Sequence, residues 1–217
     1  MAETRSILAH HFDDIEQQRE ASTLGMWVFL VTEILFFGGL FLGYTVYRTA
    51  YPETFAEASL HVDVRLGGIN TAVLICSSLT MALAVHAAQL GHRKQLIQFL
   101  LLTILLGAVF LGIKSVEYYH EFEEGFVPGL AFTYSGPHAG QVELYFLFYF
   151  FMTGLHALHM IVGIGILAVL AVQAGRSKFS PDYYTPVELT GLYWHFVDIV
   201  WIFLFPLLYL IGRHLAH

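Results

Sequence analysis

Long apolar runs separated by short polar connections dominate this chain of 217 residues. Each run reaches the length of about 20 residues that a helix needs to cross the hydrocarbon core of a bilayer. The runs cover residues 24–47, 67–90, 96–119, 144–173 and 189–211. Because the fourth run exceeds this length, we expect its helix to tilt or to project beyond the membrane.

These runs favour helices, because backbone polar groups in lipid must find partners within their own segment and no run alternates like a barrel strand. The predicted fold class is all-α, a polytopic membrane bundle of five transmembrane helices. A polar segment, residues 1–23, precedes a single domain of residues 24–217, which no repeat or flexible linker divides.

Composition agrees with lipid as the solvent, since 57% of the residues are hydrophobic and only 12% are charged. Soluble domains have charged residues at about a quarter of positions. The net charge of −7 argues against nucleic acid as a partner, which calls for a basic surface. Lone Cys76 excludes an internal disulfide and argues against a thiolate metal site.

Basic residues in the connections predict the orientation of the chain. One group of connections holds Arg5, Arg19, Arg93, Lys94, Arg176 and Lys178, and the other holds Arg48, Arg65 and Arg213. We therefore expect a cytoplasmic N-terminus and an external C-terminus. As a separate expectation, the membrane is the cytoplasmic (inner) membrane of a bacterium.

Small and aromatic residues suggest packing surfaces and interfacial anchors. Glycines in the first and fourth runs allow close helix packing, and they are Gly38, Gly39, Gly43, Gly154, Gly163 and Gly165. Aromatic residues near the ends of the runs are typical of membrane interfaces, and they are Trp27, Tyr44, Tyr47, Tyr118, Tyr119 and Tyr209.

Several ionisable residues lie inside the apolar runs, where each needs a partner or a task because a buried charge is costly. Glu33 and Asp198 each lie about nine residues, roughly 14 Å, from the expected cytoplasmic start of their helices. His156 with His159, and His195 with Asp198, are three residues apart and so lie on neighbouring parts of one helix surface. We predict a carboxylate and imidazole cluster of these five residues in the cytoplasmic half.

Three roles for this cluster stay open at this point. The first is to lock helices together through hydrogen bonds, the second is to exchange or store protons, and the third is to ligate a metal or haem. Burial favours a protonated Glu33 hydrogen-bonded to a neutral imidazole over an ion pair.

Metal chemistry finds little support in the motifs. Glu117 and His120 form one Glu-x-x-His, whereas a di-iron bundle needs two. His156 or His159 alone would suit a haem, but no other cofactor signal accompanies them. Lys114 and Glu117 are expected to form an intrahelical pair, with the lysine stem snorkelling outward. Because the sequence shows no nucleophile and base arrangement, no glycine-rich phosphate loop and no zinc signature, we expect the chain to perform no bond-making chemistry alone.

Five motifs, in order along nearly the whole chain, resemble those of the cytochrome c oxidase subunit III family. They are Trp27-Val-Phe-Leu-Val-Thr-Glu33 with the glycines that follow, Asn70-Thr71, Glu117-Tyr118-Tyr119, Gly154-Leu-His156-Ala-Leu-His159, and Tyr193-Trp194-His195-Phe196-Val197-Asp198 with Trp201. The common form of the family has seven transmembrane helices, and this chain resembles the last five. The lipid cleft that the first two helices help to form is therefore in doubt, unless a neighbouring subunit supplies them.

The resemblance implies an accessory subunit of a proton-translocating haem-copper oxidase in aerobic respiration. Haem and copper are then expected in subunit I and the other partner subunits, with none in this chain. Such a subunit stabilises the catalytic subunit, binds phospholipids and supports proton uptake. Glu33 matches the family's carbodiimide-reactive glutamate, and the remaining four cluster residues match its polar bundle residues. Lys114, Glu117 and Asn70 are secondary buried polar candidates.

Other host complexes remain alternatives. Quinol oxidases have a related subunit, nitric oxide reductases have a related accessory protein, and the electron donor is determined by another chain. A proton-coupled transporter would also bury Glu and His, but such proteins usually show inverted repeats and interrupted helices, and the sequence shows neither.

Overall fold

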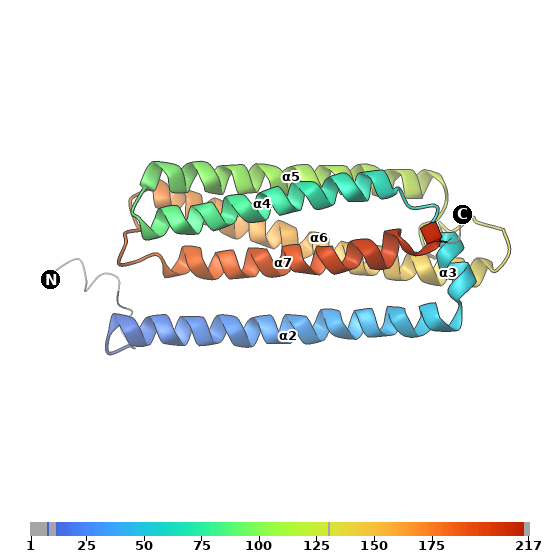
Figure 1. The fold of residues 1–217 in the computed structure, drawn as a ribbon, viewed down its shortest axis with the longest axis horizontal. Coiled ribbons are helices and arrows are strands. Elements are labelled where there is room, and N and C mark those ends of the chain that lie inside the picture. Colours follow the sequence, from blue (N-terminus) through green and yellow to red (C-terminus); the bar gives the residue numbers. More distant parts are fainter. Residues whose placement is uncertain (1–7, 9–11, 130, 215–217) are drawn as a thin grey trace.

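The computed structural model describes residues 8, 12–129 and 131–214, and nearly all of each predicted span is helical. Five long helices, each apolar enough to cross a membrane, confirm the predicted all-α class. They are α2 (Ile15–Ala50), α4 (Val64–Gln89), α5 (Arg93–Glu123), α6 (Ala139–Gly175) and α7 (Thr185–Tyr209). A short helix α3 (Pro52–Ala58) and a final 3₁₀ turn η1 (Ile211–His214) lie at one end of the bundle (Figure 1).

The helices extend beyond most of the predicted boundaries, and polar side chains cap the starts of two of them. Helix α2 begins at Ile15, well before residue 24, with the Asp14 side chain accepting a hydrogen bond from the Gln17 backbone at 2.7 Å. Asp63 caps α4 in the same way, accepting from the Arg65 backbone at 2.7 Å. Part of the polar segment 1–23 is therefore the first turns of a long helix.

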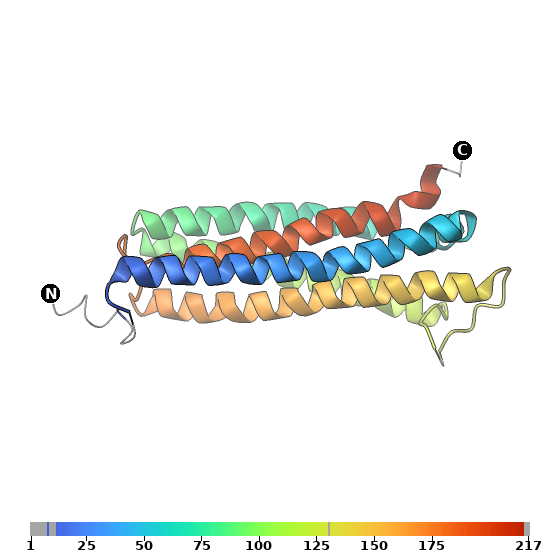
Figure 2. The same ribbon diagram turned by 90° about the horizontal axis from the view of Figure 1, so that it is seen from below.

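Helices α4, α5, α6 and α7 form a four-helix ring, in which each helix contacts its two neighbours. Helix α2 lies along the outside of α6 and α7 (Figures 1 and 2). Its buried residues are Leu30, Phe37 and Tyr44, spaced seven apart. This spacing is typical of a helix that meets its neighbours along one narrow seam, so most of α2 remains uncovered within this chain.

Glycines allow the centre of the ring to close around Trp194. A Cβ atom at Gly163 would lie 2.9 Å from the Trp194 ring, and one at Gly107 would lie equally close. The prediction that Gly163 is a packing residue is confirmed. Gly38, Gly39 and Gly165 have no neighbour within 4 Å of that position, so the expected packing role is wrong for them within the described part of this chain.

The basic residues fall on the two ends of the bundle, as the orientation argument requires. Arg93, at the start of α5, donates hydrogen bonds to the carbonyls of Ala174 and Gly175 at the end of α6. Arg65 and Arg213 meet at the opposite end, where they line one pocket. Arg5 lies outside the described residues. Which end faces the cytoplasm stays a prediction.

Candidate functional site

Glu33 on α2 and His159 on α6 form the only contact between members of the predicted cluster among the side-chain hydrogen bonds of the described residues. Glu33 Oε2 lies 3.1 Å from His159 Nε2, and both side chains are largely buried. His159 Nδ1 lies 2.8 Å from the Leu155 carbonyl oxygen. Because a carbonyl only accepts, Nδ1 carries a proton, and one further proton is shared between Nε2 and Oε2.

This pair borders a cavity of about 290 Å³ between α2, α6 and α7. Apolar side chains such as Phe29, Leu158 and Val162 make up most of its lining. The Tyr193 hydroxyl donates to the His159 carbonyl at 2.9 Å and fixes α7 against α6 there. A protonatable pair thus lies at the edge of the bundle beside an apolar recess.

His156 lies in a separate, fully enclosed place inside the ring. Its Nε2 donates to the Val197 carbonyl at 3.1 Å, and Nδ1 has no hydrogen-bond partner among the described residues. The rings of Phe110 and Trp201 flank it, with centroids 5.3 and 5.2 Å away. This environment favours a neutral imidazole that holds α6 against α7.

His195 and Asp198 share a third location, a groove between α4 and α7. His195 Nδ1 lies 2.8 Å from the Ser78 hydroxyl on α4. Asp198 is only 4% exposed, and neither of its carboxylate oxygens has a hydrogen bond among the described residues. His195 and Asp198 therefore lie together, as their spacing of three residues predicted.

The predicted single cluster of five is therefore wrong, because the structure distributes its members over three places. Residues three apart on a helix differ by about 60° in direction. In a ring of helices that angle is enough for His156 to face α7 while His159 faces α2. The spacing of hydrophobic residues predicts which side of a helix is buried. It does not predict which neighbouring helix each residue on that side contacts.

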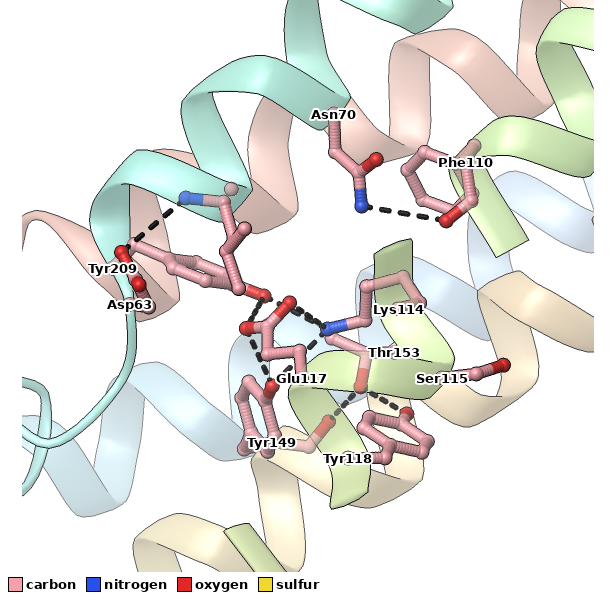
Figure 3. Close-up of polar contacts among 12 residues, drawn as sticks. Asp63, Asn70, Phe110, Lys114, Ser115, Glu117, Tyr118, Tyr149, Thr153 and Tyr209 are labelled. Atoms are coloured by element: carbon pink, nitrogen blue, oxygen red, sulfur yellow. Dashed lines mark hydrogen bonds and ion pairs between the residues drawn. The ribbon is translucent and has the colours of Figure 1, made fainter. Parts of the chain in front are cut away.

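A second polar group surrounds Lys114 on α5, in the half of the bundle where α7 ends (Figure 3). Lys114 Nζ lies 3.1 Å from Glu117 Oε2, and it donates to the hydroxyls of Tyr149 and Tyr209 at 3.1 and 2.8 Å. Both tyrosines donate in turn to Glu117 Oε1, at 2.7 and 2.6 Å. A closed network of four side chains from three helices results.

The predicted intrahelical pair of Lys114 and Glu117 is confirmed, but the predicted snorkelling is wrong. Lys114 is 3% exposed and Glu117 is 1% exposed. The lysine turns inward because two hydroxyls and a carboxylate satisfy its three N–H donors there. Asn70 is buried nearby, with its amide nitrogen 3.5 Å from the Phe110 carbonyl.

Tyrosines at helix ends are the residues that the sequence argument missed. Tyr44 and Tyr209 were expected as interfacial anchors, but both are fully buried. The Tyr44 hydroxyl donates to the Leu207 carbonyl at 2.7 Å, and Tyr209 serves the Lys114 network. Glu121, one turn beyond Glu117, was also missed and is 3% exposed. The i, i+4 spacing of the two acids was the available signal.

Metal ligation finds no ready geometry. The described residues include no group of three or more His, Cys, Asp or Glu side chains arranged to hold a metal ion. Four interhelical polar contacts make up the candidate sites, and they involve Glu33, His156, His195 and Lys114. Asp198 and Glu121 each have a buried carboxyl oxygen without a hydrogen bond among the described residues. Fold and sites together define the class, an integral membrane bundle of five spanning helices with its ionisable groups engaged mainly between helices.

Comparisons with known proteins give the family. The family model for cytochrome c oxidase subunit III matches residues 5–213. A cytochrome c oxidase subunit 3 from Corynebacterium diphtheriae is 35% identical over 191 residues, which cover 87% of each chain. A quinol oxidase subunit 3 from Bacillus subtilis is 32% identical over 189 residues, which cover 87% of this chain and 86% of that relative. The chain belongs to the cytochrome c oxidase subunit III family.

Eukaryotic relatives are longer. A cytochrome c oxidase subunit 3 from Danio rerio is 34% identical over 193 residues, which cover 85% of this chain and 67% of the relative. The five spans and the bacterial relatives make the chain an integral protein of a bacterial inner membrane. As a subunit III, it belongs to a complex with other oxidase subunits.

Proposed function

We propose that this chain is an accessory subunit of a terminal haem-copper oxidase, bound to the subunit I that carries haem and copper. The family match over residues 5–213 supports this role. The hydrogen bonds of its histidines agree with a subunit that leaves haem and copper to its partners. Both ring nitrogens of His159 are hydrogen-bonded to protein atoms, and Nε2 of His156 is hydrogen-bonded to a carbonyl. The chain itself then contributes stability and binding surfaces, and its partners contribute the electrons and oxygen chemistry.

The shared proton between Glu33 and His159 is the observation that carries a role in proton handling. Either partner can hold this proton, because Nδ1 of the imidazole already has its own. The pair lies at the protein's edge, where a proton exchanges with a partner surface more readily than in the enclosed ring around His156. Support of proton uptake by subunit I follows as its function.

Phospholipid binding is the second part of the proposal. A groove of about 440 Å³ between α2 and α7 has an almost entirely apolar lining, including Trp27, Ile34 and Phe203. Acyl chains fit such a surface because its lining has few hydrogen-bonding groups, those of His195 and Trp27, that would need polar partners. Bound lipid would cover the part of α2 that the rest of the chain leaves open.

Purification of the intact assembly tests the proposal. The tagged chain, extracted in a mild detergent, is expected to co-elute with haem-bearing subunits and to show oxygen consumption. A colourless, self-contained oligomer would contradict it. Ferrocytochrome c and a quinol, offered in turn to the purified assembly, separate the two kinds of host complex, since relatives of both kinds match this chain.

A further inference from the structure

His195 on α7 has one ring nitrogen that the described part of the chain leaves open. Its Nδ1 lies 2.8 Å from the Ser78 hydroxyl on α4. No hydrogen bond among the described residues reaches its Nε2, and Nε2 does not belong to their buried polar atoms without a partner. Because the imidazole is only half-buried, Nε2 is accessible from outside the bundle.

Nε2 of His195 needs a hydrogen-bond partner in either neutral form of the ring. When Nδ1 accepts the Ser78 proton, Nε2 carries a proton and is a donor, and when Nδ1 donates to Ser78, Nε2 is an acceptor. Ser78 permits both forms, because a hydroxyl both donates and accepts. Water would supply a partner at a soluble surface, whereas lipid tails supply none.

A groove between α4 and α7 surrounds this nitrogen with apolar side chains. Its volume is about 420 Å³, and small-molecule sites have volumes of about 300–1,000 Å³. Ile75, Leu79 and Ile202 line the groove and are exposed. His195 lies at its edge, on the strip of α7 that also borders the groove between α2 and α7. A mostly apolar lining with few polar groups is typical of a ligand site.

The other polar side chains of this groove are out of reach or engaged. Both carboxyl oxygens of Asp198 are buried. The Thr71 hydroxyl donates to the Gly67 carbonyl at 2.8 Å and accepts from Trp201 Nε1 at 3.0 Å. A molecule in the groove therefore meets His195 Nε2 as its polar contact.

His195 lies near the middle of its membrane-spanning helix. It is the eleventh residue of the 25-residue helix α7, which places it about 15 Å from the start of the helix and about 3 Å from its midpoint. Lipid headgroups and their ester carbonyls remain near the surface, about 15 Å from the centre of a hydrocarbon core that is about 30 Å thick. Acyl chains reach Nε2 but have no polar atom. The partner is therefore a molecule that brings polar atoms into the core.

We propose that the groove between α4 and α7 binds an isoprenoid quinone, with the quinone ring at His195 and the tail along the apolar walls. A quinone ring has no charge and is weakly polar, so it enters the hydrocarbon core together with its tail. The oxidised ring presents a carbonyl oxygen to an Nε2–H donor, and the reduced ring presents a hydroxyl to an unprotonated Nε2. One class of molecule thus suits both forms of His195. This binding site goes beyond the proposed function and does not depend on the electron donor of the host complex.

Photolabelling of the intact purified assembly tests the site with the chain unchanged. The probe is an azidoquinone with an isoprenoid tail, and mass spectrometry locates the labelled peptides. Label is expected on the peptides of α4 and α7 that line the groove, and excess unlabelled quinone should displace it while excess phospholipid should not. Absence of label from this chain, or equal displacement by phospholipid, would overturn the proposal. Haem absorption of the same preparation reports separately on the proposed function.

Substitution of His195 tests the hydrogen bond. His195→Phe keeps an aromatic ring without its nitrogens, so the probe concentration for half-maximal labelling of the groove should rise by about 2- to 13-fold, the range for one hydrogen bond. His195→Gln keeps a donor and an acceptor near the position of Nε2 and should stay close to the unsubstituted chain. Ile199→Leu, an apolar exchange in the same groove, is the matched control. Equal concentrations for His195→Phe and this control would contradict a quinone held by His195, and labelling of the unchanged chain decides the matter where a variant does not assemble.

Discussion

His159 Nε2 and Glu33 Oε2 lie 3.1 Å apart, while Nδ1 of the same imidazole is occupied by the Leu155 carbonyl. This arrangement fixes the tautomer of His159 and leaves one proton for the two atoms to share. The hydrogen bond of this pair joins α2 to α6, and the pair holds one proton that either atom can carry. Both functions have consequences that can be measured separately.

Glu33→Gln tests the neutral form of this pair. A glutamine amide donates to Nε2 as a protonated glutamate does, so we expect an assembled oxidase with near-normal initial turnover. Infrared spectra of the assembly should lose one carboxylic acid carbonyl band relative to the unsubstituted protein. Complete loss of assembly would contradict a protonated Glu33. Glu33→Leu, which removes the hydrogen bond, is expected to cost about 0.5–1.5 kcal/mol in stability.

The Lys114 network predicts strong coupling between two substitutions. Lys114→Met leaves Glu117 buried without its cation, and such a loss typically costs about 3–5 kcal/mol. Lys114→Met combined with Glu117→Gln removes both charges and should recover much of that stability. Unfolding of the purified complex by heat or denaturant measures both. Additive effects of the two single substitutions would show that the groups act independently.

Gly163 and Gly165 provide a matched pair of substitutions on α6. A Cβ atom at Gly163 meets the Trp194 ring at 2.9 Å, so Gly163→Ala should destabilise the chain by about 1–3 kcal/mol. Gly165 has open space at the same position. Gly165→Ala should therefore be neutral or stabilise the helix by up to about 1 kcal/mol. Thermal unfolding of the complex compares them, and equal effects would contradict the packing around Trp194.

Tyr44 tests the seam that holds α2 in place. Its hydroxyl donates to the Leu207 carbonyl at 2.7 Å within a fully buried site. Tyr44→Phe keeps the ring and removes the donor, so a loss of about 1 kcal/mol is expected. Limited proteolysis near the ends of α2 should become faster, and Tyr47→Phe, at an exposed tyrosine on the same helix, is the control. Unchanged proteolysis would show that the hydroxyl does not hold α2.

Hydrophobic length alone predicted the five spans, because lipid allows few structures and requires about 20 apolar residues for each helix. The ends of α2 and α5 lay further out than predicted, since a helix continues through polar residues until a cap or turn ends it. Which imidazole contacts Glu33 was beyond prediction, and so was the lack of a hydrogen bond to Asp198 among the described residues. Each depends on which neighbouring helix a side chain faces, and an apolar run does not specify the rotation of its helix.

The buried tyrosines also show that sequence position does not determine the partner of a polar side chain. Position near the end of a run indicated an interfacial anchor for Tyr209, but Lys114 and Glu117 offered it better partners inside the bundle. The lysine stayed inside for the same reason. Pairing between groups far apart in sequence, here 95 positions for Lys114 and Tyr209, decides such cases.

Cofactor content after separation of the subunits shows whether this chain holds a redox centre of its own. The tagged chain is purified within its complex and then released with a stronger detergent, and haem absorption and copper are measured in both fractions. We expect the remaining complex to keep all of the haem and copper and the released chain to have neither. Stoichiometric haem or copper in the released chain would contradict an accessory subunit that leaves electron transfer to its partners.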